Sequence, residues 1–328
     1  MERLSVPAFA RRNEMATQSA PSLLINGFGV LFVILNAFGL GLRLPIGNLL
    51  TQVFVHRKIA ALTLVTNFVV IPFLFIGYLL TIASSIPGEI KIGFCVASLS
   101  AGMPFAPLLS RLAKANAGIS TTLLVVLTVA TVIALPIGLP LAVDAVDAQL
   151  KVSAWDVAWP LLLFLLLPLG LGCAVRVLFA DLAPPLARWV VRVAILCLLF
   201  NLNFTLVAYW NLFVNTWGTK SYIAAIAGPF IGLGCGYLLV SSLRVKDVGT
   251  RHAAEVTTAV RNIGPMLLMM IFPFVTDPLV TVSITILNSI GILTVLLFAL
   301  AWRHAAVRAT AQAESPSTGE ATPPPTST

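Results

Sequence analysis

Charged residues are scarce in this chain. Aspartate, glutamate, lysine and arginine make up 10% of its 328 residues, whereas hydrophobic residues make up 59%. A water-soluble domain carries far more surface charge, so this composition excludes the ordinary soluble class. The net charge of +8 does not indicate nucleic-acid binding, because the basic residues lie mostly in short loops between apolar segments. That distribution is typical of a protein that crosses a membrane several times.

Cysteine and histidine are also rare. The four cysteines fall one to an apolar segment without CxxC spacing, which predicts neither disulfides nor a zinc site. The three histidines stand at segment ends beside lysine or arginine, so we expect no bound metal and no other cofactor. The chain lacks the motifs of zinc proteases, serine hydrolases and nucleotide-binding loops, and we therefore expect no enzyme activity.

Nine apolar segments each reach the roughly 20 residues that a helix needs to cross a bilayer. They lie at residues 22–42, 58–82, 88–112, 117–143, 155–180, 188–214, 221–243, 250–273 and 278–302. We therefore predict an all-α polytopic membrane protein with about nine transmembrane helices. Residues 1–21 are expected to form a polar tail. Residues 303–328 end in a stretch of alanine, serine, threonine and proline, and we expect them to be disordered.

Glycine and proline interrupt two of these segments. Gly102 and Pro104 lie in the third segment, and Gly264 and Pro265 lie in the eighth. Proline removes a backbone donor, and freed backbone groups are tolerated at membrane depth only where they face protein or a water-filled cavity. Two such broken helices in corresponding halves point to the binding site of a transporter. Because they lie five segments apart, an odd number, we predict inverted repeats.

Loop charges predict the orientation in the membrane. The loops after segments one, three, five and seven hold most of the basic residues, and the opposite loops hold three lysines and most of the acids. We therefore expect the C-terminus in the cytoplasm and the N-terminus outside. The expected location is a cell membrane, such as the inner membrane of a bacterium.

Polar side chains within the spans supply the candidate binding residues. Arg261 and Asn262 adjoin the second interruption, and Asn288 lies in the last segment. A guanidinium near the bilayer centre needs a partner, and Glu255 lies six residues earlier, about 9 Å along an ideal helix and roughly 120° around it. Carbonyls of the other broken helix or a bound anion remain as partners. The threonines of the fourth segment are expected to bond their own helix; they are Thr121, Thr122, Thr128 and Thr131.

Four short stretches resemble the bile acid:sodium symporter family, which belongs to a wider superfamily that includes arsenite exporters. They are residues 38–44 (FGLGLRL), 112–117 (LAKANA), 261–264 (RNIG) and 287–291 (LNSIG). The similarity extends from about residue 22 to residue 302. The resemblance implies that Asn262 and Asn288 match positions that line the family's substrate cavity.

The same resemblance implies two domains. A core formed by residues 58–143 and 221–302 contains the two broken helices, which cross each other. A smaller panel formed by residues 22–42 and 155–214 moves against the core. Together they make the transporter domain of residues 22–302.

The resemblance does not extend to the family's sodium ligands. Where sodium-coupled members carry a serine-asparagine pair after the first interruption, this chain has Ala106 and Pro107. A threonine ligand corresponds to Leu124, and a glutamate and a glutamine correspond to Thr257 and Arg261. Hard cations need oxygen ligands, so sodium coupling is not carried over.

We therefore predict a secondary transporter that moves a small organic anion across the lipid bilayer by alternating access. Arg261 is expected to anchor the anionic group, with Asn262 and Asn288 completing the polar contacts. One alternative is an arsenite or oxyanion exporter, which a cysteine beside the first interruption would favour; the nearest is Cys95. Another is a membrane sensor that does not transport, although the sequence carries no appended soluble domain.

Overall fold

The computed structural model describes residues 8–44, 46–146, 151–271 and 277–314, and this part of the chain contains helices and no strand. The predicted all-α class is therefore confirmed. The elements in chain order are α1 (Ala8–Arg43), α2 (Ile46–Val55), α3 (Arg57–Val65), η1 (Thr66–Val70), α4 (Ile71–Thr81), α5 (Gly88–Leu99), α6 (Ala106–Leu112), α7 (Ala117–Val146), α8 (Ala154–Leu161), η2 (Leu162–Leu166), α9 (Leu167–Leu178), α10 (Ala183–Ala208), α11 (Trp210–Thr216), α12 (Ser221–Ser242), α13 (Val248–Ala259), α14 (Ile263–Ile271) and α15 (Pro278–Glu314).

Seven helical stretches among the described residues are long and apolar enough to cross a membrane. They are Leu23–Arg43, Arg57–Thr81, Ala117–Val146, Ala154–Leu178, Ala183–Ala208, Ser221–Ser242 and Pro278–Arg308. Each lies close to a segment predicted from the sequence. The two other predicted segments are the interrupted ones, α5 with α6 and α13 with α14, whose separate parts are too short to cross alone. The count of nine spans stays a prediction.

The first and last helices extend further than we predicted. α1 begins at Ala8, inside the expected polar tail, and α15 continues past residue 302 to Glu314. The helix over residues 303–314 corrects the disorder predicted for that stretch. Both extensions are rich in alanine, arginine and glutamine or glutamate, which favour helices, and each prolongs an existing helix without a new nucleation step. The rest of the predicted tail, residues 315–328, lies outside the described residues.

Two spans contain a π-helical turn that ends two positions before a proline. The turn η1 precedes Pro72, and the turn η2 precedes Pro168. Proline cannot donate to the carbonyl four residues earlier, and its ring collides with that carbonyl. A wider turn at this point lets the helix continue. These two prolines therefore deform their helices without ending them.

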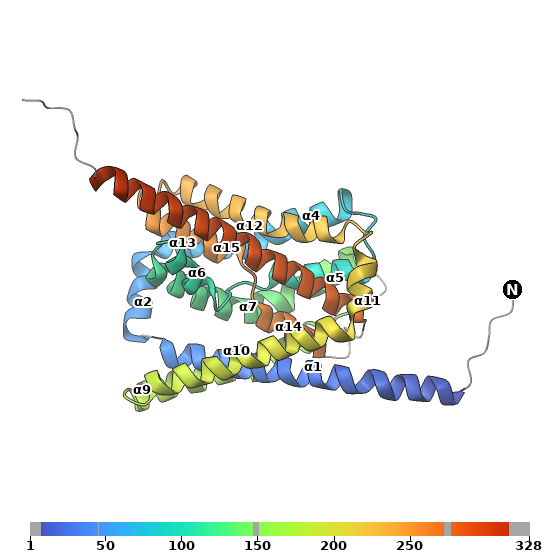
Figure 1. Cartoon of the computed structure of the whole chain (residues 1–328). Helices are drawn as coiled ribbons and strands as arrows, with labels where there is room; N and C mark the ends of the chain where they lie inside the picture. The colour runs from blue at the N-terminus through green and yellow to red at the C-terminus, as the bar shows by residue number, and fades with distance from the viewer. Residues whose placement is uncertain (1–7, 45, 147–150, 272–276, 315–328) are drawn as a thin grey trace, which may run out of the picture.

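The helices are arranged in two layers (Figure 1). α1, α9 and α10 run along the bottom of the view, and α4, α5, α7, α12, α13 and α15 lie above them. Within the lower layer, α1 packs against both α9 and α10. Gly41 of α1 faces Gly172 of α9, and a Cβ atom on Gly172 would collide with the carbonyl oxygen of Phe38. Backbones approach this closely only at small residues, so α1 and α9 form a tightly joined pair.

The upper layer contains both interrupted helices. α5 packs against α7 and α15, and α13 packs against α6, α7 and α12. α14 contacts α5 in this layer and α1 in the lower one. One buried apolar cluster includes Val33 of α1, Phe94 of α5 and Met266 of α14. The interrupted helices are therefore held in the interior of the molecule, between other helices.

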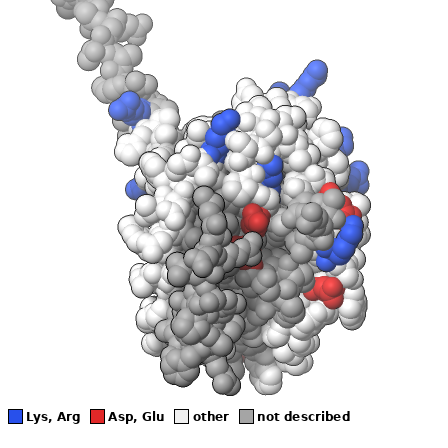
Figure 2. Space-filling model, turned by 90° about the vertical axis from the view of Figure 1, so that its right-hand side faces the viewer, with Lys and Arg blue, Asp and Glu red and all other residues white. Residues whose placement is uncertain are grey.

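Charged residues differ between the two ends of the helices. Figure 2 views the end where α5 and α11 lie and shows acidic side chains beside a few basic ones. At this end the acids include Asp144 in the last turn of α7, which forms an exposed ion pair of 3.3 Å with Lys151. The connections at the opposite end carry mainly basic residues, namely Arg43, Arg57, Lys58, Arg111, Lys114, Arg176, Arg188, Arg244, Lys246, Arg251 and Arg303.

Candidate functional site

The first interruption separates α5, which ends at Leu99, from α6, which begins at Ala106. Gly102 and Pro104 both lie in this break. Pro104 cannot donate to the carbonyl of Ser100, four residues earlier, and the helix ends one residue before Ser100. Gly102 has a φ of +81°, a left-handed conformation that glycine adopts without a steric cost.

The second interruption separates α13, which ends at Ala259, from α14, which begins at Ile263. Gly264 and Pro265 lie just after this break, in the first turn of α14. Pro265 excludes a helical bond to the carbonyl of Arg261, which lies in the middle of the break. In both helices, the chain therefore leaves the helical path close to the carbonyl that proline cannot satisfy.

The two breaks are joined directly by their backbones. The amide nitrogen of Asn262 donates to the carbonyl oxygen of Ser100 at 2.9 Å. The Oδ1 atom of Asn262 accepts a hydrogen bond from the amide of Gly264 at 3.0 Å, which satisfies a donor at the start of α14. Asn262 thus connects the first break to the second through its main chain and stabilises the start of α14 through its side chain.

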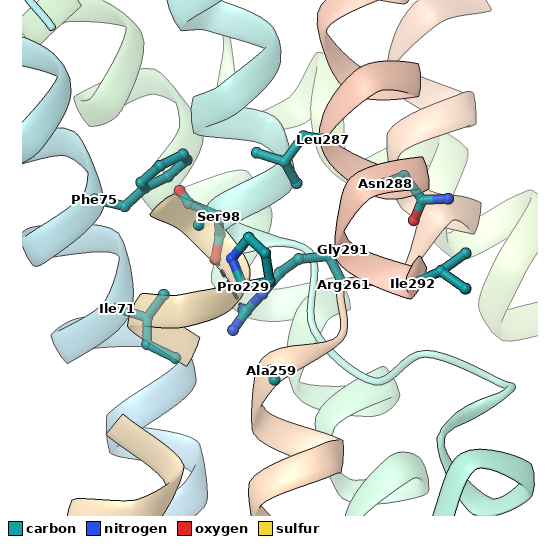
Figure 3. A pocket seen from close by; sticks show the side chains of 11 residues that line it. Ile71, Phe75, Ser98, Pro229, Ala259, Arg261, Leu287, Asn288, Gly291 and Ile292 are labelled. Carbon is teal, nitrogen blue, oxygen red and sulfur yellow. Dashed lines mark hydrogen bonds between the residues drawn. The ribbon is translucent and has the colours of Figure 1, made fainter. Parts of the chain in front are cut away.

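Arg261 connects the C-terminal ends of both broken helices. Its Nη1 atom donates to the carbonyl oxygen of Ser98 in α5 at 3.2 Å, and Nη2 donates to that of Thr258 in α13 at 2.6 Å. Figure 3 shows the side chain extending from the break toward Ser98. The last carbonyls of a helix lack partners within the helix and carry partial negative charge, so a guanidinium is well matched to them.

No carboxylate forms an ion pair with Arg261 in the described part of the chain. Glu255 lies in α13, before the break, and pairs with Nδ1 of His252 at 3.0 Å. The side chain of Arg261 is 8% exposed, and a charge at membrane depth costs at least about 2.5 kcal/mol on insertion scales. Two hydrogen bonds from a charged donor contribute about 3 to 6 kcal/mol together, which is enough to offset that cost. The positive charge itself remains without a counter-charge.

Threonines of α7 satisfy the backbone of the first break. The hydroxyl of Thr131 lies within hydrogen-bond distance of both the amide and the carbonyl of Ala101, at 3.3 and 3.1 Å. The hydroxyl of Thr128 donates toward the carbonyl oxygen of Gly102 at 3.3 Å. Both hydroxyls also lie close to carbonyls of their own helix, as the sequence predicted. The contacts of these two hydroxyls with the first break were not predicted from the sequence, because helical spacing does not show which segment of the chain passes beside a threonine.

Arg261 and Asn288 line one small cavity, together with Phe75, Ser98 and Pro229. Its volume is about 20 Å³, which is enough for a water molecule and too small for an organic anion. In Figure 3 the amide of Asn288, on α15, points away from the guanidinium of Arg261. Asn288 is 4% exposed, and its side chain makes no hydrogen bond to another described residue.

Thr258 has a buried hydroxyl that finds no hydrogen-bond partner among the described residues. Its carbonyl oxygen is the one that accepts from Arg261. A polar group of this kind stays unpaired only at a cost of about 1 to 3 kcal/mol. Thr258 therefore binds Arg261 through its backbone, while its own hydroxyl is left without a partner in the described part of the chain.

A second, larger cavity of about 450 Å³ lies between the two layers. Asn36 of α1 and Ile195 of α10 line it from the lower layer, and Phe105, Pro107 and Leu124 line it from the upper layer. Phe105 belongs to the first break. This cavity therefore reaches the place where the two breaks meet, which we call the crossing. Cys95, by contrast, is fully buried and lines neither cavity, which gives no support to an arsenite site beside the break.

Two residues at the positions aligned with sodium ligands, Thr257 and Leu124, make other contacts in the structure. Thr257 shares a hydrogen bond of 2.9 Å with Ser120 and donates to the carbonyl of Ala253. Leu124 is a buried apolar side chain. The described residues contain no group of three or more histidine, cysteine, aspartate or glutamate side chains that could hold a metal ion.

Comparison with known protein families gives one finding. A family model described as the sodium bile acid symporter family matches residues 30–226. The match includes the first break, the large cavity's lining from α1 to α10 and the start of α12, and it ends before the second break. No curated protein matches the chain.

The geometry predicts different outcomes for two glycines at the breaks. A Cβ atom on Gly102 would lie 2.7 Å from the amide nitrogen of Thr128, in a backbone conformation that other residues avoid, whereas on Gly264 its nearest neighbour is 3.2 Å away, in the Asn262 side chain. We expect Gly102→Ala to lower the free energy of unfolding by at least about 1 to 2 kcal/mol. Gly264→Ala should lower it by less, because the atom that its Cβ would meet is a side-chain oxygen, which can shift more easily than a backbone amide.

Thermal unfolding of the two purified variants in detergent measures this difference, with the parent protein as reference. Equal sensitivity of the two positions would contradict the distinction.

Proposed function

Since the chain belongs to the sodium bile acid symporter family, we propose that it is a secondary transporter of a small organic anion that works by alternating access. Its seven apolar helices and its family make it an integral membrane transport protein. The observation that carries the choice of an anion is the guanidinium of Arg261 at the crossing, buried and without a carboxylate partner among the described residues.

The two layers supply the moving parts of this proposal. The lower layer corresponds to the panel of residues 22–42 and 155–214, and the upper layer to the core of residues 58–143 and 221–302. The close contact between Gly41 and Gly172 supports movement of the lower layer as one unit. The large cavity between the layers is where a rocking motion would open or close access to the crossing. Nine spans with inverted halves complete this architecture.

Arg261, Asn262 and Asn288 form the proposed substrate site. A guanidinium has five donors, and the two hydrogen bonds to carbonyls leave the others free for a carboxylate or sulfonate. Of the three residues, Arg261 and Asn288 line the small cavity, whereas the Asn262 side chain accepts from Gly264. In the described conformation this cavity has room only for a water molecule, so binding requires the helices around it to separate.

Substitution of Arg261 tests its role in binding. A thermal-shift screen of small organic anions first identifies a ligand, since any ligand that binds only the native state raises its stability. We expect Arg261→Lys to weaken that ligand about tenfold, because one charge-assisted hydrogen bond is lost, and Arg261→Gln to weaken it about a hundredfold. Asn262→Asp, which keeps the side-chain acceptor for Gly264, adds a negative charge and should also weaken it. Unchanged affinity in a folded Gln variant would assign Arg261 to a purely structural role.

We also propose that transport does not require sodium. Ala106, Pro107 and Leu124 offer no side-chain oxygen, and Arg261 already occupies two carbonyls at the crossing with a fixed positive charge. The melting temperature should therefore be the same in sodium chloride and in choline chloride at equal ionic strength. Uptake of the identified anion into proteoliposomes should persist when potassium replaces sodium. Abolished uptake in potassium would refute this proposal.

The loop charges support an orientation with the C-terminus and the basic end of the helices in the cytoplasm. Serine-to-cysteine substitutions at opposite ends test it, in a background without the native cysteines. Ser85 lies exposed between α4 and α5, and Ser242 lies exposed at the end of α12. An impermeant thiol reagent should label the cysteine at 85 in intact cells and leave the one at 242 unlabelled until the membrane is opened. The reverse pattern would invert the orientation.

A further inference from the structure

The large cavity between the layers is surrounded by four arginines. Arg43 comes from the end of α1, Arg111 from the end of α6, and Arg188 and Arg192 from the first turns of α10. Arg188 and Arg192 are four residues apart, so both side chains leave α10 on the same face. Three elements that are far apart in the sequence thus bring basic groups to one cavity of about 450 Å³.

None of these arginines has an acidic partner among the residues that the structure describes. The ion pairs among the described residues join Lys151 to Asp144 and His252 to Glu255, and neither pair touches this cavity. Arg192 lies over the ring of Trp189, with 5.2 Å between its Cζ atom and the ring centroid, and this contact leaves its charge uncompensated. Like charges around a cavity repel one another and concentrate anions there.

The rest of the cavity wall is mainly apolar. Leu40, Phe105 and Ile195 contribute hydrocarbon surface, and Asn36 and Thr121 add two polar side chains. An inorganic ion would use the arginines and leave this surface in contact with water. An anion with an apolar body would cover this hydrocarbon surface, and the burial of apolar area would add to the binding free energy supplied by the arginines. The walls and the charges together therefore fit an amphipathic ligand.

We propose that this cavity binds an anion with at least two negative charges carried on an apolar body, and that this anion is the transported substrate. The inference rests on the proposed function and narrows its substrate from a small organic anion to one with two or more carboxylate, sulfonate or phosphate groups. Four basic side chains spread over the cavity can contact separate anionic groups at once, which a single guanidinium at the crossing cannot do. The headgroup of an anionic lipid has the same chemistry and is the other source of such a ligand.

Two probes with the same ring system separate the contribution of charge to the affinity from that of apolar contact. Titration calorimetry of the detergent-purified protein with 2,6-naphthalenedicarboxylate should give an affinity about tenfold higher than with 2-naphthoate, which has the same rings and one carboxylate fewer. Raising the salt concentration should reduce this difference, because exposed charges are screened. Equal affinity for the two probes, or no binding of either, would overturn the proposal.

Substitutions of the cavity arginines test whether the dianion binds in this cavity. The double substitution Arg188→Gln and Arg192→Gln should remove the preference for the dianion, and the matching double lysine variant should keep most of it. Arg57→Gln is the control, since Arg57 is an exposed arginine at the same end of the molecule that does not line the cavity. Thermal unfolding without ligand checks that all variants are folded. An undiminished preference in the double Gln variant would place the dianion elsewhere and refute the assignment.

The same titration with mixed micelles of phosphatidylglycerol and of phosphatidylcholine distinguishes the two sources of such a ligand, a soluble anion and the headgroup of an anionic lipid. Binding of the dicarboxylate with no preference for phosphatidylglycerol supports a soluble substrate, whereas stabilisation by phosphatidylglycerol alone would overturn it. Uptake into proteoliposomes separates this inference from the proposed function. Transport without any preference for dianions would refute the inference and leave the function intact. Binding of the dianion without its transport would refute its assignment as the substrate, and failure to transport any organic anion would refute the proposed function.

Discussion

Backbone polar groups that are released within a membrane must find partners inside the protein, and the centre of this structure is organised by that constraint. Pro104 and Pro265 each prevent a helix from continuing, so the breaks expose carbonyl and amide groups at membrane depth. Each break is satisfied by the other or by a neighbouring helix. Asn262 bonds Ser100 through its amide, and threonines of α7 bond the first break. The crossing is therefore a polar centre surrounded by apolar helices.

Arg261 has two roles in this arrangement that share one physical cause. Its guanidinium is held by the last carbonyls of α5 and α13, which carry the negative ends of two helix dipoles. The same burial that makes those hydrogen bonds strong also leaves the charge without bulk water around it. A structural arginine and an anion anchor are thus compatible, and any anion that approaches would compete with the carbonyls or use the donors that they leave free.

Positive charge occurs at two depths. Arg261 lies at the crossing, and the four cavity arginines lie near the basic end of the helices, with Phe105 of the first break lining the same cavity. On the proposed route, an anion would meet several screened charges first and a single desolvated charge afterwards. The four exposed arginines would speed the binding of anions and favour those with more negative charge. Arg261, which is buried, would become accessible to the anion only when the two layers separate. This order follows because the four arginines lie toward the basic end of the helices, whereas Arg261 lies in the break of an interrupted helix.

The sequence by itself determined the membrane class, the position of seven spans, the two proline-centred breaks and the family, since apolar runs, prolines and basic loops act locally. It did not determine the ends of α1 and α15, because helix-forming residues prolong an existing helix into a polar stretch.

Which groups satisfy the breaks depends on the tertiary structure alone. Thr131 and Thr128 are far from Ala101 and Gly102 along the chain, and their contact depends on how α7 passes the break. It likewise decided that Gly102 is confined by backbone atoms, whereas the atom nearest to a Cβ on Gly264 belongs to a side chain. Finally, it brought arginines from α1, α6 and α10 to one cavity, because helix packing, and not spacing in the sequence, sets which side chains meet.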